Sequence, residues 1–184
     1  MLRVVSGTAK GRKLISPPDD GRIRPTTDRV KEAIFDIIQF DVEGRKVLDL
    51  FAGSGQLGIE ALSRGAKIVA FVDENSDAIK LIRQNVEKCA SVFSELQYYI
   101  YQSDAVSFLK RKEKYDIIIL DPPYMTNLMK KALDAIITVD KLEFGGIIIC
   151  ESPKPLEELD GYFRKVYKYG KTYVTVFKSE EQSA

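Results

Sequence analysis

The chain has 184 residues, of which 45% are hydrophobic and 30% are charged, which indicates one globular domain over residues 1–184 and excludes disorder. Histidine is absent, which excludes Ser-His-Asp and Cys-His nucleophile arrangements and most zinc sites, so we predict no metal site. The net charge is +1, but residues 1–31 carry eight basic and three acidic residues. This excess of positive charge indicates either that the N-terminal end binds a polyanion or that it is an ordinary solvated surface.

The first 25 residues predict a small basic hairpin followed by a turn region. Two apolar runs, Leu2–Val5 and Leu14–Ile15, flank a stretch that contains glycine and lysine, which is the pattern of a β-hairpin. Residues 17–25 combine Pro-Pro, Asp-Asp-Gly and Arg-Pro, which predicts turns. We therefore expect residues 1–25 to form a small N-terminal extension.

A helix is expected next, because apolar residues recur at helical spacing from Val30 to Ile38, with Thr27 or Asp28 as the N-cap. Strands then alternate with helices. The expected strands are Lys46–Leu50, Ile68–Asp73, Leu96–Tyr101, Tyr115–Leu120 and Gly146–Glu151. The expected helices are Leu57–Arg64, Ser76–Cys89, Ala105–Arg111 and Asn127–Ile137. Such alternation predicts a mostly parallel sheet that helices cover on both faces.

The C-terminal part breaks this alternation. Tyr162–Tyr169 and Thr172–Lys178 face each other across Gly170 and Lys171, which predicts an antiparallel hairpin. Repeated strand–helix units that end in such a hairpin are typical of the Rossmann-like, seven-stranded α/β fold of methyltransferases, with expected strand order 3-2-1-4-5-7-6. Dehydrogenase-type Rossmann domains lack this ending.

A glycine-rich loop follows the first strand of the alternating region. Leu48–Gly58 reads LDLFAGSGQLG and contains G-x-G-x-x-G, the spacing typical of a dinucleotide site that binds a pyrophosphate. Acidic residues nevertheless follow or end the strands, at the sheet edge where ligands of parallel sheets bind. They are Asp49, Asp73, Asp104 and Asp121. Four carboxylates at one edge would repel a pyrophosphate and favour a ligand that carries positive charge.

S-adenosylmethionine has groups that match these acids: an α-ammonium, a sulfonium, a ribose diol and an adenine amine. We expect Asp49 to accept from the ammonium, directly or through water, and Asp73 to bind both ribose hydroxyls. Asp104 is expected to accept from the adenine amine, while the Ala105 amide donates to a ring nitrogen. The glycines would let the backbone approach the methionine part.

The motif Asp121-Pro122-Pro123-Tyr124 directly follows an apolar strand. Two successive prolines force a rigid, extended exit from the sheet. That rigidity is expected to aim the Asp121 carboxylate and the Pro122 carbonyl at one point, where both accept hydrogens of an aromatic amine and direct its lone pair at the methyl group. Tyr124 would offer a ring on which a base can stack.

The reaction predicted from these residues is direct displacement of a methyl group from sulfonium to an exocyclic amine. Positioning is the first expected role of Asp121, and acceptance of the departing proton is the second. A cytosine-C5 mechanism would need a cysteine nucleophile, but neither Cys89 nor Cys150 is placed at the loop after the fourth strand. Both cysteines lack a C-x-x-C partner and are expected to be free thiols in a reducing compartment.

Three stretches carry a resemblance to a known family: LDLFAGSGQLGIEALSRGA, DPPY and GRIRPTTDRVKEAIFDII. Together they resemble the RsmD family of bacterial methyltransferases, and the likeness runs from Arg3 to about Glu151. That family methylates N2 of a guanine, at position 966, in 16S ribosomal RNA with S-adenosylmethionine as donor. The resemblance implies the same reaction here, on 16S rRNA within the 30S subunit or an assembly intermediate of it.

Carried onto this chain, the resemblance implies that Arg24, Pro25 and Thr26 form a lid beside the methionine end of the cofactor. The expected cofactor-binding residues are then Arg24, Thr26, Asp49, Phe51, Gly53, Gly55, Gly58, Asp73, Asp104 and Ala105. The expected catalytic, guanine-holding residues are Asp121, Pro122, Pro123 and Tyr124. The expected RNA-binding residues are Arg3, Lys10, Arg12, Lys13, Arg22 and Arg29. One departure is Asn75, where family members often have an acid.

Other readings stay open at this stage. The same chemistry suits an amino-methyltransferase that acts on DNA adenine or cytosine, on another RNA, or on a protein glutamine, although glutamine methylases favour Asn in place of Asp121. A nicotinamide-dependent oxidoreductase or a non-catalytic nucleotide-binding module would leave the DPPY motif unexplained. No apolar run is long enough to span a bilayer and no secretory core is visible near the start, so we expect a cytoplasmic protein.

Overall fold

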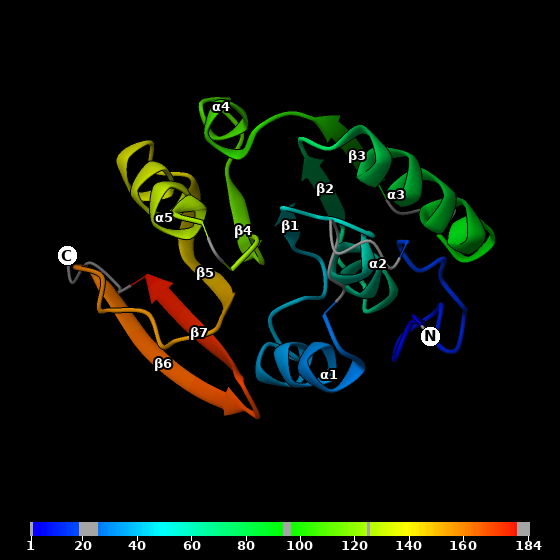
Figure 1. Ribbon diagram of the computed structural model, residues 1–184, viewed down its shortest axis with the longest axis horizontal. Coiled ribbons are helices and arrows are strands. Elements are labelled where there is room, and N and C mark those ends of the chain that lie inside the picture. Colours follow the sequence, from blue (N-terminus) through cyan, green and yellow to red (C-terminus); the bar gives the residue numbers. More distant parts are fainter. Residues whose placement is uncertain (1, 19–25, 94–96, 125, 180–184) are drawn as a thin grey trace.

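The computed structural model describes residues 2–18, 26–93, 97–124 and 126–179. Within these residues the centre of the molecule is a sheet of seven strands (Figure 1). The strands are β1 (Lys46–Leu50), β2 (Ile68–Asp73), β3 (Gln97–Gln102), β4 (Tyr115–Leu120), β5 (Leu142–Ser152), β6 (Tyr162–Tyr169) and β7 (Thr172–Ser179). Their order is β3-β2-β1-β4-β5-β7-β6, with parallel pairing except at β7. The predicted seven-stranded fold and its terminal antiparallel hairpin are therefore confirmed.

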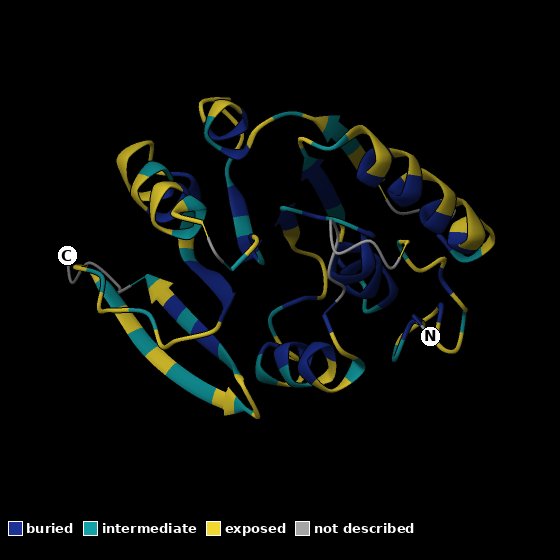
Figure 2. Ribbon diagram, in the orientation of Figure 1, coloured by how far each residue is buried: buried dark blue, intermediate teal, exposed yellow. Residues whose placement is uncertain are grey.

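Helices cover both faces of the sheet. They are α1 (Asp28–Ile37), α2 (Gln56–Ser63), α3 (Ser76–Cys89), α4 (Ala105–Leu109) and α5 (Leu128–Thr138), with a 3₁₀ turn, η1 (Ala90–Val92), after α3. Helices α1, α2 and α3 lie on one face of the sheet, and α4 and α5 lie on the other (Figure 1). In α1, α3, α4 and α5 the surface that faces the sheet is buried and the outer surface carries exposed residues, whereas every residue of α2 is buried (Figure 2).

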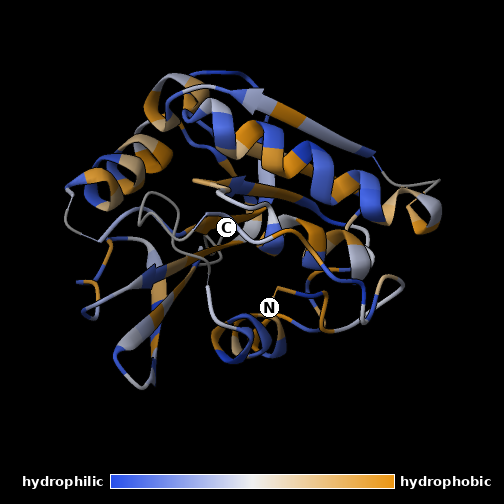
Figure 3. Cartoon of the chain, turned by 45° about the vertical axis from the view of Figure 1, so that its right-hand side comes forward, coloured by the Kyte–Doolittle hydropathy of each residue, from blue (hydrophilic) through white to orange (hydrophobic). Residues whose placement is uncertain are grey.

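Alternation along the strands divides the core into two layers. Val47, Ile117 and Ile149 pack with α1, α2 and α3, whereas Leu48 and Ile118 pack with α4 and α5. Along α3, hydrophilic and hydrophobic residues alternate, as expected for a helix with one buried side (Figure 3). Side-chain alternation of period two therefore decides on which side of the sheet each residue near the pocket lies.

The N-terminal segment pairs with itself as predicted, through one antiparallel bridge between Arg3 and Lys13. It packs against α2, because the buried Glu60 accepts hydrogen bonds from the backbone amides of Val5 and Ser6 at 2.8 and 2.9 Å. Gly7 has a φ of +79°, and a Cβ there would lie 1.7 Å from the carbonyl oxygen of Ser63. Only glycine therefore allows this close approach to α2.

Most element bounds agree with the sequence prediction to within one or two residues. Thr27 is the N-cap of α1, since its side chain accepts from the Val30 amide. The main difference is β5, which begins at Leu142 and not at Gly146. Leu142 pairs with Tyr115 of β4 because the register of the two strands shifts between Tyr115 and Ile117. No local pattern in the sequence predicts this shift. None of the described helices is long and apolar enough to cross a membrane.

Candidate active site

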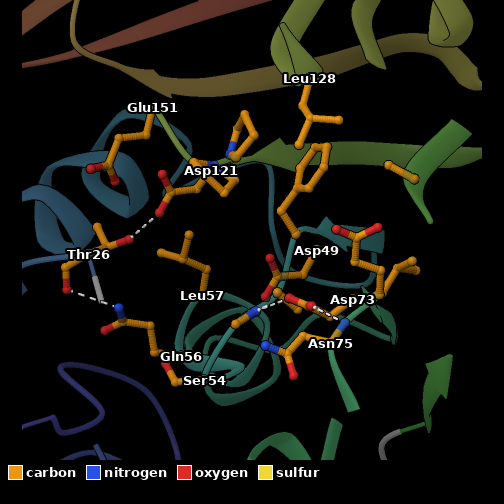
Figure 4. Close-up of a pocket in the computed structure, with 18 of the residues that line it drawn as sticks. Thr26, Asp49, Ser54, Gln56, Leu57, Asp73, Asn75, Asp121, Leu128 and Glu151 are labelled. Atoms are coloured by element: carbon orange, nitrogen blue, oxygen red, sulfur yellow. Dashed lines mark hydrogen bonds between the residues drawn. The ribbon is translucent and has the colours of Figure 1, made fainter. Parts of the chain in front are cut away.

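A pocket of about 390 Å³ opens at the carboxyl ends of β1, β2 and β4 (Figure 4). It collects residues from the segment before α1, from the glycine loop, from the ends of β2, β4 and β5, and from the start of β7. The predicted site residues that line it are Thr26, Asp49, Phe51, Gly53, Asp73, Asp104, Ala105, Asp121, Pro122, Pro123 and Tyr124. The structure therefore brings the four predicted catalytic residues and seven of the ten predicted cofactor-binding residues into one cavity.

Asp49 lies on β1 and is only 2% exposed. Its Oδ2 accepts a hydrogen bond of 2.8 Å from the Gly58 amide in the first turns of α2. Burial raises the pKa of Asp49 to about 7; the Gly58 amide lowers it, and the neighbouring Asp73 charge raises it further. This carboxylate is therefore poised between its neutral and charged forms near neutral pH.

Asp73 ends β2 and holds the glycine loop in place. Its Oδ2 accepts from the Gly53 amide at 2.8 Å, and its Oδ1 accepts from the Asn75 amide at 2.9 Å. Each carboxylate oxygen has two lone pairs, so these backbone bonds leave acceptor capacity toward the pocket. Asn75 is the N-cap of α3, because its side chain accepts from the Asp77 amide at 2.8 Å. The asparagine that departs from the family pattern therefore has a structural role here.

Asp104 is the N-cap of α4 and accepts from the Ser107 amide at 3.0 Å. Hydrogen bonds from Ser107 hold the pKa of Asp104 below its usual range. It lies on the pocket wall beside Ala105, at the end of β3. The geometry is consistent with the predicted pair of a carboxylate acceptor and a backbone donor.

The glycine loop contains a strained residue that is not a glycine. Phe51 has a φ of +74°, and a left-handed backbone costs such a residue about 1–2 kcal/mol. The amides of Phe51 and Ala52 both donate to the carbonyl of Val72, at 3.0 and 2.9 Å, which fixes this conformation. Strand β2 thus holds the Phe51 backbone at the pocket wall.

Gly55 and Gly58 do not line the pocket. Gly55 has a φ of +76° at the N-cap of α2. A Cβ on Gly58 would lie 2.2 Å from the ring of Phe71, so this glycine allows α2 to pack closely on β2. Their part in the site is indirect: Gly58 donates to Asp49 and both shape the loop.

The loop after β4 is tied to the segment before α1. The Thr26 hydroxyl donates to Asp121 Oδ2 at 2.8 Å, and the Gln56 side chain donates to the Thr26 carbonyl at 3.0 Å (Figure 4). Lys31 Nζ in turn donates to Gln56 Oε1 at 3.3 Å. Thr26, Gln56 and Lys31 are all buried. A chain of hydrogen bonds therefore runs from the interior of α1 to the predicted catalytic carboxylate.

Tyr124 closes the same end of the pocket. Its hydroxyl donates to Glu151 Oε1 at 2.8 Å. Burial raises the pKa of Tyr124 to about 12, and the nearby carboxylates of Glu151 and Asp121 add to the shift. The phenol is therefore neutral and acts as a hydrogen-bond donor at physiological pH.

Among the pocket residues that the sequence did not predict, Gln56 and Glu151 hydrogen-bond to predicted site residues. Gln56 lies inside the glycine motif, at a position where the spacing G-x-G-x-x-G requires no particular residue. Glu151 is an acid at the carboxyl end of a strand, as Asp121 and Asp73 are, so the rule that identified those two also applies to it. The pattern alone does not show that Glu151 reaches the same cavity.

The predicted RNA-binding residues differ in their surroundings. Lys10, Lys13 and Arg29 are exposed. Arg3 forms an ion pair with Asp28 at 3.1 Å, and Arg12 donates to the Lys88 carbonyl and to Ser91 Oγ at 2.9 and 2.8 Å. Arg12 therefore fastens the N-terminal segment to the end of α3. The predicted residues Arg22, Arg24 and Pro25 lie outside the described residues.

Comparison with known proteins agrees with this fold. A family model described as "Conserved hypothetical protein 95" matches residues 2–178. YlbH of Bacillus subtilis, provisionally named an rRNA methyltransferase, is 40% identical over 96% of this chain and 98% of its own length. Ribosomal RNA small subunit methyltransferase D of Haemophilus influenzae is 34% identical over 83% of this chain and 79% of its own length. The structure of Escherichia coli yhhF, provisionally named a methyltransferase, has a TM-score of 0.83 with 27% identity and covers 98% of this chain and 99% of that chain.

The strand order, the terminal hairpin and the acid-lined pocket define a protein of the seven-stranded methyltransferase class. Within that class, the chain belongs to the family of conserved hypothetical protein 95. Its relatives over most of the length of this chain include proteins named as ribosomal RNA methyltransferases.

Proposed function

We propose that this protein transfers a methyl group from S-adenosylmethionine to the exocyclic N2 amine of a guanine in 16S rRNA of the small ribosomal subunit. The observation that carries the proposal is Asp121, whose carboxylate lies in the same pocket as Asp49 and Asp73 and is oriented by the Thr26 hydroxyl. The small-subunit names of relatives at 34% identity support the choice of 16S rRNA.

The pocket fits the proposed cofactor in charge and in size. An α-ammonium beside the buried Asp49 would favour its ionised form, for which a pKa of about 7 leaves little intrinsic cost at neutral pH. Asp73, fixed by two backbone amides, offers its remaining lone pairs to a ribose diol. The volume of about 390 Å³ falls in the range of small-molecule sites. The cofactor supplies a methyl group on a sulfonium, which is activated for displacement.

The residues of the chain then position the acceptor amine. Asp121 and the carbonyl of Pro122 accept its two hydrogens, so that its lone pair points away from the ring toward the methyl group. The cofactor, held by Asp49 and Asp73, would supply the methyl group and leave as the neutral thioether, and Asp121 or water would take the proton that the methylated nitrogen loses. Tyr124, which also lines the pocket, offers a ring for stacking of the base.

A methyl-transfer assay tests this proposal with three acceptors: 30S particles, naked 16S rRNA and duplex DNA. We expect labelled methyl to enter the small-subunit acceptors as N2-methylguanine, and Asp121→Ala to lower the rate by at least about 100-fold. Asp134→Ala, an exposed position on α5 away from the pocket, is the matched control and should retain full activity. Preferred labelling of DNA would overturn the substrate, and equal rates for wild type and Asp121→Ala would overturn the role of Asp121.

The target position is tested separately. Ribosomal RNA from cells that lack this gene should be missing one N2-methylguanine, at the position that corresponds to guanine 966. Mass mapping of 16S rRNA fragments measures this in the deletion strain and in the same strain complemented with the gene. A complete modification pattern in the deletion strain would contradict the proposal.

A further inference from the structure

Glu151 is a buried acid in the pocket to which the site described so far gives no role. It lies near the end of β5, is 7% exposed and lines the cavity with Asp121 and Tyr124. A carboxylate is costly to bury, so its position at the substrate end of a pocket points to a specific contact. Figure 4 shows Glu151 and Asp121 toward one end of the pocket, and Asp49 and Asp73 toward the other.

Strand register places Glu151 beside Asp121. Leu120, the last residue of β4, pairs with Cys150 of β5 in a parallel ladder, so Asp121 directly follows β4 and Glu151 is the next residue of β5. Adjacent strands lie about 4.8 Å apart, and both acids line the pocket. Two carboxylates therefore come from neighbouring strand ends in the region where the acceptor base is expected.

Tyr124 fixes the orientation of Glu151. Its neutral hydroxyl donates to Glu151 Oε1 at 2.8 Å, which holds the carboxylate against the aromatic residue of the DPPY motif. The same hydrogen bond fixes the hydroxyl end of the tyrosine ring, which lines the pocket. The carboxylate is thus preorganised at the edge of the ring on which a base would stack.

We propose that Glu151 accepts a hydrogen bond from N1–H of the target guanine, beside the N2 amine that Asp121 binds. This inference rests on the proposed function and adds the group that selects the base. In guanine the amine neighbours a ring N–H donor, whereas the ring nitrogen beside the amine of adenine or cytosine is an acceptor. A carboxylate accepts a hydrogen bond from the ring N–H of guanine but is repelled by the lone pair of the ring nitrogen in adenine or cytosine. Glu151 would therefore reject adenine and cytosine, the other two bases that carry an amine.

The test replaces the base and not only the protein. Small-subunit acceptors are assembled from 16S rRNA whose target nucleotide is either guanosine or 2,6-diaminopurine riboside, which keeps the 2-amine but has an acceptor at N1. Wild type should prefer guanosine by about 10- to 100-fold in kcat/KM, as expected for one hydrogen bond to a charged group. Glu151→Gln should reduce this preference to about 3-fold or less. The glutamine amide can accept a hydrogen bond from N1–H of guanosine and can donate one to N1 of 2,6-diaminopurine riboside.

Tyr124→Phe removes the hydrogen bond that orients Glu151 and keeps both the carboxylate and the ring, so its preference should fall between those of wild type and Glu151→Gln. Asp134→Ala, on the exposed side of α5 and away from the pocket, is the matched control and should keep the preference of wild type. A purely structural role for Glu151 would instead give all of these variants the same preference as wild type. Since the preference is a ratio measured on one preparation, it does not depend on the fraction of folded enzyme.

An unchanged preference in Glu151→Gln would overturn the inference and leave the proposed function intact. Failure of wild type to methylate the guanosine acceptor at all would instead overturn the proposed function. The two results are distinguishable because the first concerns only the ratio of rates on two bases and the second concerns the rate of wild type itself.

Discussion

Thr26 and Asp121 lie 95 positions apart in the chain, and the Thr26 hydroxyl donates a hydrogen bond of 2.8 Å to the Asp121 carboxylate. Thr26 is held from the other side by Gln56, which donates to its carbonyl at 3.0 Å. The segment that the family resemblance assigns to a lid over the cofactor therefore also orients the carboxylate that is proposed to bind the acceptor amine. The two proposed roles, cofactor binding and acceptor positioning, therefore meet at Thr26.

Replacement of Thr26 by valine should impair catalysis more than cofactor binding. Valine keeps the shape of threonine but removes the donor, so Asp121 loses the bond that orients it. We expect kcat to fall by about 10-fold, a typical result for loss of one hydrogen bond to a charged group. Single-turnover methyl transfer measures the rate, and titration with S-adenosylhomocysteine measures the binding. Thr26→Ser keeps the donor and should retain most activity; equal losses in Thr26→Ser and Thr26→Val would contradict this role.

We predict that ionised Asp49 lowers the free energy of unfolding near neutral pH, where it is proposed to bind the cofactor. Its pKa is raised from 3.8 to about 7 in the folded chain, so the folded state holds the proton more tightly than the unfolded state. Stability from this group is full below about pH 4 and is lost as pH rises to about 7. Asp49→Asn removes the buried charge and should raise the free energy of unfolding at pH 8 by about 2–4 kcal/mol, with little change at pH 4. Urea unfolding at both pH values measures this, and a destabilised variant at pH 8 would refute it.

The same substitution should weaken cofactor binding. Ionised Asp49 attracts an ammonium, so the affinity of wild type for S-adenosylhomocysteine should increase from pH 6 to pH 8 as the carboxylate loses its proton. Asp49→Asn should bind about 10-fold or more weakly at pH 8 and should show no increase over this range. Calorimetric titration across the pH range is the measurement. A parallel pH dependence in both proteins would mean that another group contacts the ammonium.

Gly58 is expected to be intolerant of a side chain for reasons of packing. A Cβ at this position would lie 2.2 Å from the ring of Phe71, which is fully buried, so Gly58→Ala must displace α2 or the ring. We expect a loss of about 1–3 kcal/mol in unfolding free energy. The double variant Gly58→Ala, Phe71→Leu should lose less than the sum of the two single variants, because leucine makes room for the methyl group. Additive losses in denaturant titrations would exclude this contact as the cause.

The sequence predicts the fold well because its signals are local and repeated. The apolar strands, the helices between them and the Gly170-Lys171 turn each specify an element, and parallel connection rules then fix the order. The acids Asp49, Asp73 and Asp121 are identifiable from the sequence because they lie at or near the carboxyl ends of apolar strands. Gln56 and Glu151 are not, because their roles arise from partners far away in the chain, Thr26 and Tyr124. The packing role of Gly58 likewise depends on the ring of a neighbouring strand.

Lys31 should anchor the N-terminal segment to the body of the protein. Its side chain is fully buried, and its ammonium donates to the Arg3 carbonyl at 2.6 Å and to Gln56 Oε1 at 3.3 Å, with Asp28 Oδ1 at 3.4 Å. Lys31→Met keeps the apolar stem but leaves these acceptors without their donor, at an expected cost of about 2–4 kcal/mol. Limited trypsin digestion should then cut more readily after Arg12 or Lys13. The control Lys80→Met, whose ion pair with Asp77 is exposed, should change stability by at most about 0.5 kcal/mol.

The exposed lysines of the N-terminal hairpin are expected to act in RNA binding alone. Lys10 and Lys13 are exposed and do not line the pocket, so Lys10→Glu, Lys13→Glu should leave S-adenosylhomocysteine binding unchanged. The double variant should raise KM for 30S particles and reduce the slope of log affinity against log salt by about 2, one for each lost phosphate contact. Filter binding at several salt concentrations measures the slope. Lys67→Glu, an exposed lysine just before β2 at the opposite end of the sheet from the pocket, controls for net charge. An equal change of slope in Lys67→Glu would show that the effect is one of overall charge and not of a docked hairpin.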